Sequence, residues 1–512
     1  MGMSLLTIPL EILEHIAFHL ATDKLSGPPT DLISLSFTCK ELYRSLAISR
    51  NSTLYAAIFS YKFDTEAIRR RLGPEGVTAS ALTVELFRRF DALRRLQHGE
   101  GSQIILSDSS HREDDLWIAI LMMLENDGKN AIQLKEFGRI ADWLKNYFLE
   151  IYGGSYIQHD NNYSNWPRNT PENRMALWLL YLCENDGIII SPLYADIYRA
   201  FAVGANRYHI TPFTWTDFRH PCLPGPSGIY PTEYFNHTFH PTCPSIALPA
   251  ILGHMSHLKE PILWRLSSRS LQNRATFRKP LPNVSGSKRW DMDWERWKPV
   301  VYTPDTDSKM SNVIQRYLFP SIFDGTWEGL FTIQYMDFGV FAAILSGEPP
   351  HIATDSTIGQ NLHIWKIREY HLHVSSSNTS ILPPGPPQNA FFPTSATITD
   401  SPGQVVFSLH SHSLTYTRAK KDITKEKNNT IKDIILLGEG HSAWGEFRLK
   451  GRVRAGDGFI TVVKEYNGPD DRGRWLYRGY LIGGKYVGRW RDTMTPTSMV
   501  GYEGGFELYK RS

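Results

Sequence analysis

The sequence predicts a multidomain α+β protein, with helices in its N-terminal part and an antiparallel β-barrel in its C-terminal part. Its 512 residues suggest about two to four domains. Apolar residues recur at intervals of three and four before residue 207, which is typical of helices, and alternate with polar residues after Pro320, which is typical of strands. The 14 Trp, 24 Tyr and 25 Phe beside 38 Gly favour turn-rich, aromatic-packed β structure.

Composition narrows the class of protein and its compartment. With 41% hydrophobic and 21% charged residues, the chain has ordinary globular usage, which excludes a disordered or rod-like protein. A formal charge of +3 is too balanced to indicate a nucleic-acid or membrane surface. Four cysteines are too few for a disulfide scaffold and the N-terminus does not resemble a secretion signal, so we expect a protein of the cytoplasm, the nucleus or both.

The first predicted helix begins after Pro9, a residue that the first turn of a helix tolerates. Ile12, Leu13 and Ile16 fall on one apolar stripe, whereas Glu14 turns outward. The same spacing predicts further helices over residues 31–49, 53–71, 80–97, 114–125, 132–152 and 171–184.

These patterns divide the chain into four parts. A small helical bundle is expected over residues 4–50 and a helical linker domain over residues 51–207. From 208 to 320 the periodicity fails and Pro, Trp and His are frequent, which predicts an irregular connector packed on its neighbours. Residues 321–512 form the predicted barrel.

Eight runs of alternating residues predict the strands of the barrel. In the first run Trp327 and Phe331 share one face, and polar residues occupy the other. Short turns such as Gly483-Gly484 favour tight hairpins, and consecutive hairpins predict an antiparallel meander that closes or nearly closes. The runs cover residues 326–335, 362–374, 404–417, 444–454, 459–466, 475–482, 486–491 and 506–510. Exposed loop insertions are predicted over residues 383–387 and 418–432.

An ordered set of features marks the N-terminal bundle. The segment from Leu6 to Ile16 has an apolar-Pro-x-Glu-Ile-Leu start, and the later segment opens with Asp31-Leu32 and contains Cys39-Lys40 at the start of another helix. This order resembles the F-box, a family motif that folds as a small helical bundle and docks on a Skp-type adaptor. A bundle of roughly 45 residues cannot bury all of its apolar surface alone, so a patch is left for a partner.

Two features depart from the F-box pattern. The loop from Leu20 to Asp31 is longer than the usual spacing and carries Gly27-Pro28-Pro29, an insertion that loop entropy tolerates. In addition, Leu42 stands where an aromatic residue is common, with Tyr43 beside it.

The resemblance implies a non-enzymatic substrate-recognition subunit of an SCF-type E3 ubiquitin ligase complex, built from a Skp adaptor, a cullin and an F-box protein. Its expected partners are the Skp-type adaptor, the cullin bound through it, and an unidentified protein substrate; no cofactor, catalytic residue or metal site is expected. The residues implied to bind the adaptor are Ile8, Pro9, Glu11, Ile12, Leu13, Ile16, Leu32 and Leu42. The C-terminal series from Gly325 to Trp490 resembles the β-barrel receptor domain of a subset of F-box proteins and, more loosely, lipocalin-like barrels.

Several alternatives stay open. The N-terminal helices could begin an ordinary α-domain, or an F-box could act outside any ligase and bind the adaptor without the cullin. A protein of another class would hold a small apolar ligand in the barrel lumen, with the helices as an unrelated interaction module. A lumen binder needs an empty interior and an apolar mouth, whereas a peptide receptor needs a filled interior and a surface groove.

Other motifs have two interpretations each. Residues 479–485 match a phosphate-binding loop up to Lys485, but Tyr486 replaces the Ser or Thr and both flanks are predicted strands, so we expect a hairpin with Lys485 as a turn residue. Four of five His and Cys side chains could hold a structural zinc, or all could be ordinary side chains. These five are His220, Cys222, His237, His240 and Cys243.

Acidic and aromatic residues complete the candidates. The pairs Asp291/Asp293 and Asp470/Asp471 are predicted to be solvated turn acids. Four tryptophans either fill the barrel core or line a recognition pocket at its mouth, because aromatic residues dominate interface hot spots. They are Trp327, Trp444, Trp475 and Trp490.

Overall fold

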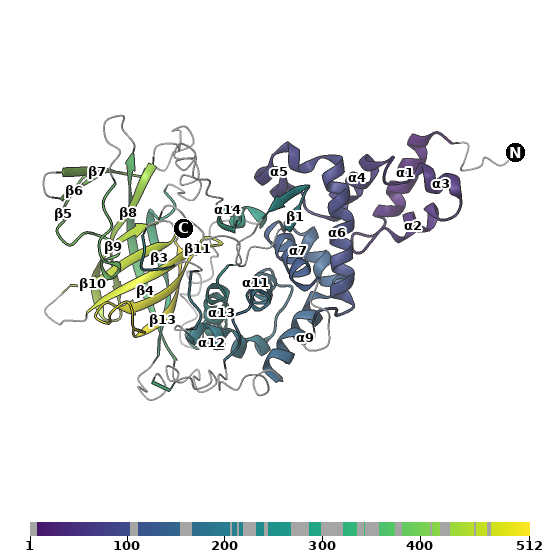
Figure 1. Ribbon diagram of the computed structural model, residues 1–512. Helices are drawn as coiled ribbons and strands as arrows, with labels where there is room; N and C mark the ends of the chain where they lie inside the picture. Colours follow the sequence, from purple (N-terminus) through teal and green to yellow (C-terminus); the bar gives the residue numbers. More distant parts are fainter. Residues whose placement is uncertain are drawn as a thin grey trace.

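The N-terminal group of short helices and the large β-sheet lie at opposite ends of the molecule, with the longer helices between them (Figure 1). This arrangement comes from a computed structural model. It describes residues 8–102, 111–153, 166–204, 207–211, 214–218, 232–239, 244–267, 286–297, 321–334, 342–343, 358–373, 381–409, 412–419, 431–454, 457–467 and 473–511.

The N-terminal bundle consists of α1 (Leu10–Thr22), α2 (Thr30–Ser36) and α3 (Lys40–Ser45). The prediction of one helix over residues 31–49 was wrong, because the backbone is extended at Cys39, with φ −155° and ψ 162°. The Cys39 sulfur accepts a hydrogen bond from the Leu42 amide at 3.5 Å and so caps α3. The side chains of α1 pack against α2 and against the helix that follows α3.

The middle of the molecule is helical, as predicted for residues 51–207. The prediction of one helix over 53–71 fails at Phe63, where the backbone is extended, and the prediction over 132–152 fails at Arg139, where φ is 49°. A π-helical turn, Gln133–Phe137, precedes that second break. The helices are α4 (Ser52–Lys62), α5 (Glu66–Leu72), α6 (Ala79–Gln97), α7 (Arg112–Leu124), α8 (Lys129–Ile132), α9 (Ile140–Gly153), α11 (Pro171–Asn185) and α12 (Ala195–Val203).

The segment predicted to be an irregular connector contains regular structure. Its elements are β1 (Thr232–Tyr234), β2 (His237–Phe239), α13 (Ala247–Ser267) and α14 (Asp291–Trp297). Helix α13 packs on α11, α12 and the last two strands of the barrel, so the expectation of an irregular chain was wrong there. Pro249 and Pro261 interrupt the apolar spacing that identified the other helices. The expected burial of the tryptophans is confirmed for Trp290, Trp294 and Trp297, which are 2%, 5% and 4% exposed.

Eight antiparallel strands close the barrel. In order around it they are β3 (Gly325–Gln334), β13 (Glu503–Lys510), β12 (Lys485–Asp492), β11 (Arg474–Ile482), β10 (Ile460–Tyr466), β9 (Gly445–Val453), β8 (Ile431–Ser442) and β4 (Ile358–His373), and β4 pairs with β3 to complete the circle. The predicted hairpin between β11 and β12 is confirmed, with φ 53° at Gly483 and 82° at Gly484. A left-handed backbone at both positions suits a two-residue turn.

Two strand predictions were wrong. The run predicted as one strand contains two paired strands, β6 (Gln404–Leu409) and β7 (His412–Arg418). Together with β5 (Thr397–Ser401) they extend the sheet beside β4 instead of joining the barrel wall. The eighth wall strand is β8, whose first residues were assigned to a loop. Its Ile434 faces the barrel interior and its Ile435 faces the core beneath the extension. Because both faces of β8 are buried, its sequence does not alternate.

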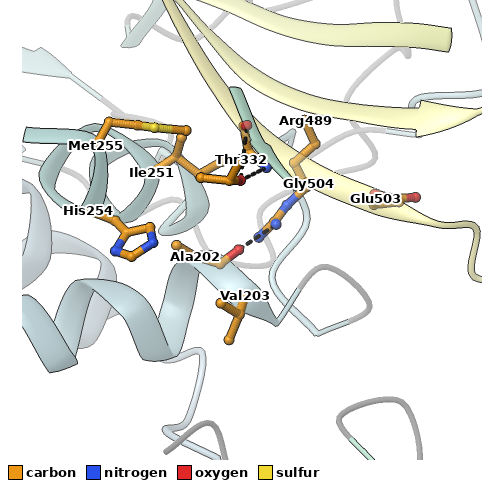
Figure 2. A pocket seen from close by; sticks show the side chains of 10 residues that line it. Ala202, Val203, Ile251, His254, Met255, Thr332, Arg489, Glu503 and Gly504 are labelled. Carbon is orange, nitrogen blue, oxygen red and sulfur yellow. Dashed lines mark hydrogen bonds between the residues drawn. The ribbon is translucent and has the colours of Figure 1, made fainter. Parts of the chain in front are cut away.

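The barrel and the helices share a hydrophobic core. Phe459, Ile482 and Val487 of the barrel belong to the same buried cluster as the side chains of the helices. Buried Arg489 of β12 donates a hydrogen bond of 2.5 Å to the Ala202 carbonyl oxygen of α12 (Figure 2). The cavity beside this contact has a volume of about 20 Å³, enough for one water molecule. We therefore assign a structural role, and not a ligand-binding role, to this contact.

Candidate functional site

The predicted adaptor-binding residues fall into two groups by exposure. Leu13, Leu32 and Leu42 are 5%, 1% and 4% exposed, and they pack in the core of the bundle. The second group is exposed or half-buried, and Ile12, which is 50% exposed, belongs to it. The exposed or half-buried members are Ile8, Pro9, Glu11, Ile12 and Ile16. The three leucines therefore hold the helices together, and of the predicted residues only those on the outer side of α1 are accessible from outside the bundle.

A second exposed apolar group spans α2 and α3. Phe37 and Tyr43 are 73% and 56% exposed and stack with ring centroids 6.1 Å apart. Ile33 lies one turn before Phe37 on α2 and is 44% exposed. We call Ile33, Phe37 and Tyr43 the α2–α3 patch. Leu42, which the F-box resemblance implied as a docking residue, is turned inward by α3. Its neighbour Tyr43 lies on the surface instead, and its aromatic side chain beside Leu42 was the available signal.

The long loop between α1 and α2 is fixed to the helical region. The Gly27 amide donates a hydrogen bond of 2.9 Å to Oε1 of Gln133, and Nε2 of Gln133 donates to the Leu25 carbonyl oxygen at 2.6 Å. Gly27 has a φ of 82°, which favours glycine, and its backbone lies against the Phe137 ring. The inserted loop therefore connects the bundle to the residues around the π-helical turn.

Large side chains fill much of the described barrel interior, and a cavity lies near one end. Its volume is about 150 Å³. The cavity lies where β8 turns into β9 and where β11 and β13 begin, at the opposite end from the Gly483-Gly484 turn. It is lined by Phe331, Trp444, Lys464, Tyr466, Trp475, Tyr477, Trp490 and Tyr502. We call this the aromatic pocket.

Three rings of the aromatic pocket pack edge to face. The Trp475 and Trp490 centroids are 5.3 Å apart, and those of Trp490 and Tyr502 are also 5.3 Å apart. Trp490 is 3% exposed, whereas Trp475 and Tyr502 are half-buried. The pocket thus has a buried base and a half-buried rim. Mutual packing limits the rotamers of these rings, so the shape of the pocket is largely preformed.

Among the described residues that line the aromatic pocket, Lys464 is the one with an ionisable amine. It is 1% exposed, and its Nζ lies 4.1 Å from the ring centroid of Phe447, 4.6 Å from that of Tyr466 and 5.2 Å from that of Phe331. Burial lowers the pKa of Lys464 to about 7, because the charged form is poorly solvated there. At neutral pH this amine is therefore divided between its charged and neutral forms.

His363 of β4 lies beside the same group. Its ring centroid is 4.8 Å from that of Phe331, and its Nδ1 accepts a hydrogen bond of 3.2 Å from Nε1 of Trp365. Burial, with a smaller contribution from the charge of Lys464, holds the pKa of His363 well below its usual range. The imidazole is therefore neutral and adds no second positive charge beside the lysine.

The tryptophans that the sequence singled out divide between the two expected roles. Trp327 is 1% exposed and fills the core, whereas Trp444, Trp475 and Trp490 line the aromatic pocket. The sequence analysis missed Lys464. Its signal was the alternation of β10, which places it in phase with inward-facing Ile460.

The remaining sequence motifs have structural roles, lie on the surface or fall outside the described residues. Lys485 is the first residue of β12, not a turn residue, and its Nζ lies 2.8 Å from a carboxylate oxygen of Glu507. The prediction of a solvated acid was wrong for Asp293, which is 1% exposed and accepts a hydrogen bond of 3.0 Å from the Gly483 amide. His237 is exposed on β2. Lying outside the described residues are His220, Cys222, His240, Cys243, Asp470 and Asp471.

The described residues contain no group of three or more His, Cys, Asp or Glu side chains that could hold a metal ion. None of the helices in this part of the chain is long and apolar enough to cross a membrane. Comparison of the whole chain with protein-family models, with curated proteins and with solved structures finds no match.

Proposed function

We propose that this protein is the substrate-recognition subunit of an SCF-type E3 ubiquitin ligase. The N-terminal bundle would dock on a Skp-type adaptor that binds a cullin, and the barrel would bind the protein substrate. The observation that supports this proposal best is the α2–α3 patch, where Phe37 is 73% exposed and stacks on Tyr43. Neighbouring exposed apolar side chains of this size are typical of protein interaction sites.

The arrangement of the molecule suits this role. The bundle and the barrel lie at opposite ends (Figure 1), so both can be occupied at once. A substrate receptor needs no active site, because it raises the effective concentration of a substrate lysine near a thioester that another subunit carries. The hydrogen bonds of Gln133 to the loop of the bundle would keep the adaptor in a fixed orientation relative to the helices.

A small-ligand barrel is the second candidate, and the aromatic pocket is the observation that favours it. Most of the interior is occupied by large side chains such as Trp365, Tyr486 and Phe506, which are 0%, 1% and 0% exposed. Small-molecule sites commonly have volumes of about 300–1,000 Å³. The filled interior therefore favours the protein receptor, with the aromatic pocket as a subsite for one ring-sized group.

Co-purification tests the docking surface. The variant Phe37→Asp combined with Tyr43→Asp places charge on the α2–α3 patch, and Ile12→Asp does so on α1. The control is Ile190→Asp, because Ile190 is 90% exposed and lies outside the bundle. We expect the wild type and the control to recover the Skp adaptor and the cullin, and the patch variants to lose both.

Two outcomes would contradict the proposal. Recovery of the adaptor by the wild type and all variants alike would exclude the named docking surface. Recovery of the adaptor without the cullin would indicate a protein that acts outside the ligase. All substituted residues of the bundle are exposed, so a circular dichroism spectrum like that of the wild type is expected for each variant.

A further inference from the structure

The aromatic pocket has the size and chemistry of a site for one ring. Its volume of about 150 Å³ is comparable with that of a protein cavity that accepts benzene. Seven of its eight lining residues are aromatic, and Trp475, Trp490 and Tyr502 offer faces and edges to a planar group. An apolar ligand of this size would be held by burial and ring stacking.

Lys464 needs hydrogen-bond acceptors and a negative charge, which none of the described residues supplies. A protonated lysine has three N–H donors, and among the described residues no carboxylate pairs with Lys464 and no acceptor receives a hydrogen bond from it. The rings of Phe447, Tyr466 and Phe331 attract the charge, but they do not replace a counter-ion. A buried charge without a partner is costly, so a ligand that brings a negative oxygen would relieve that cost.

We propose that the aromatic pocket binds a carboxylate joined to a ring-sized apolar group, with Lys464 receiving the carboxylate and the rings of Trp475, Trp490 and Tyr502 receiving the apolar part. A cationic ligand would be repelled by Lys464, and a neutral ligand would leave its charge unpaired. This site does not depend on adaptor docking by the N-terminal bundle.

The same chemistry has two sources. One is a free aromatic acid, and the other is the C-terminal residue of a polypeptide that ends in an aromatic side chain. Both present one carboxylate close to one ring. Phenylacetate represents the first source, and a short peptide ending in Phe with a free carboxyl group represents the second.

The first experiment compares charged and neutral ligands of one shape. Phenylacetate and phenylacetamide are titrated into the full-length protein at pH 6.5, roughly half a unit below the pKa given for Lys464. Calorimetry measures affinity, and tryptophan emission reports occupancy, because three tryptophans line the pocket. We expect phenylacetate to bind about tenfold or more tightly than phenylacetamide, because hydrogen bonds to charged groups are stronger than those between neutral groups. Binding of phenylacetate and phenylacetamide with equal affinity would overturn the proposal.

The second experiment removes the amine. Lys464→Met keeps the length of the side chain, and we expect it to eliminate the preference for phenylacetate over phenylacetamide. Lys450→Met is the matched control, because Lys450 of β9 lies over the Phe392 ring on the other face of the sheet and does not line the pocket. A preference that survives in Lys464→Met contradicts the assignment. If Lys464→Met does not fold, the affinities of the wild type for phenylacetate and phenylacetamide still test the proposal.

The peptide identifies the source of the carboxylate. Binding of the free-acid peptide but not of its C-terminal amide supports the site and indicates a polypeptide terminus. Tighter binding of phenylacetate than of the peptide also supports the site and indicates a small acid. Failure of both free acids to bind excludes the proposed chemistry.

The pH dependence gives an independent readout. In the part of the chain that the structure describes, the titratable groups facing Lys464 around the cavity are His363 of β4, Tyr466 of β10, Tyr477 of β11 and Tyr502 before β13, and none of these is a carboxylate. As the pH rises above about 7 the free amine loses its proton. Phenylacetate stays ionised, because carboxylic acids titrate near pH 4 or so. Its affinity should therefore fall above pH 7, approaching about tenfold per pH unit, while that of phenylacetamide stays constant. A constant phenylacetate affinity would contradict the role of Lys464.

Discussion

The amide of Gly27 donates a hydrogen bond of 2.9 Å to the side chain of Gln133, although the two residues are 106 positions apart in the chain. Gln133 is 0% exposed, and its Nε2 also donates to the carbonyl oxygens of Leu25 at 2.6 Å and Lys62 at 3.2 Å. One amide side chain thus satisfies backbone groups of both the α1–α2 loop and the end of α4. The insertion that lengthens this loop is therefore part of the joint between the bundle and the helical region.

Replacing Gln133 with Leu is expected to loosen that joint. The Gly27 amide and the Leu25 carbonyl would lose their partner inside the protein, and each buried unsatisfied group costs roughly 1–3 kcal/mol. We expect the free energy of unfolding to fall by about 2 kcal/mol or more, measured by urea denaturation. Lys135→Ala is the control, because Lys135 is exposed on the same turn. Equal stability of the two variants would show that the joint does not depend on Gln133.

Lys464 is expected to make stability depend on pH. Burial lowers its pKa from the ordinary 10.5 to about 7. Below pH 7 the lysine is charged in both states, so the folded protein carries the whole cost of burying the charge. Between about pH 7 and 10.5 only the unfolded chain keeps the proton, and stability rises with pH. Lys464→Met should therefore raise the free energy of unfolding by a few kcal/mol at pH 6 and by less at pH 9. Thermal unfolding at both pH values checks this, and the same gain at each would exclude the shift.

Asp457 should make stability depend on pH in the acidic range, where its charged form stabilises the fold, in contrast to the charged form of Lys464. Burial alone would raise the pKa of its carboxyl, but the Arg454 guanidinium and the Tyr480 hydroxyl, each 2.7 Å away, outweigh burial and leave that pKa below its usual range. The stabilisation is complete above the unfolded value near 3.8 and is lost as the pH falls through the folded value.

Substitution of Asp457 tests this sign. Asp457→Asn leaves the buried charge of Arg454 unpaired, so we expect a loss of about 3 kcal/mol at pH 7 and a smaller loss near pH 3. Asp91→Asn removes a surface ion pair with Arg94 and should change stability little at either pH. Denaturant unfolding measures both variants, and a pH-independent loss for Asp457→Asn would refute the coupling.

Close strand approach predicts different costs for two glycines of the barrel. A Cβ atom at Gly488 would lie 1.9 Å from the Arg478 carbonyl oxygen, whereas one at Gly505 would lie 3.2 Å from the end of the Ile251 side chain. A side chain can shift but a paired strand cannot. We therefore expect Gly488→Ala to lower the free energy of unfolding by at least about 1–3 kcal/mol, and Gly505→Ala to lower it by less. Melting temperatures of the two variants give the order, and the reverse order would contradict this packing argument.

Local signals predicted most of the barrel and failed where their physical basis was absent. Gly483-Gly484 predicted a hairpin correctly, because few other residues adopt the left-handed backbone that the turn needs. Strand β8 escaped recognition because its Ile434 and Ile435 face different cores and are both buried, so no alternation remains. Helix α13 escaped because two prolines break its spacing.

The candidate sites, like the fold, could be predicted from the sequence only in part. The position of Leu13 on an apolar stripe indicated an interacting helix, but the stripe could not distinguish the side that holds the bundle together from the side left exposed. Trp475 and Trp490 were identified as pocket candidates, whereas the role of Lys464 requires the register of β10 against β11, where Lys464 lies opposite Trp475. That register is a property of the closed sheet and not of any short segment.

The common core of the helices and the barrel has a mechanical consequence. Because Phe459, Ile482 and Val487 are buried together with side chains of the helical region, a rotation of the barrel against the helices would expose apolar surface and break the contact of Arg489 with Ala202. The barrel and the helical region are thus expected to move together as one rigid body. In the function proposed above, any movement that brings a bound substrate closer to a catalytic subunit would then have to come from the substrate or from that subunit.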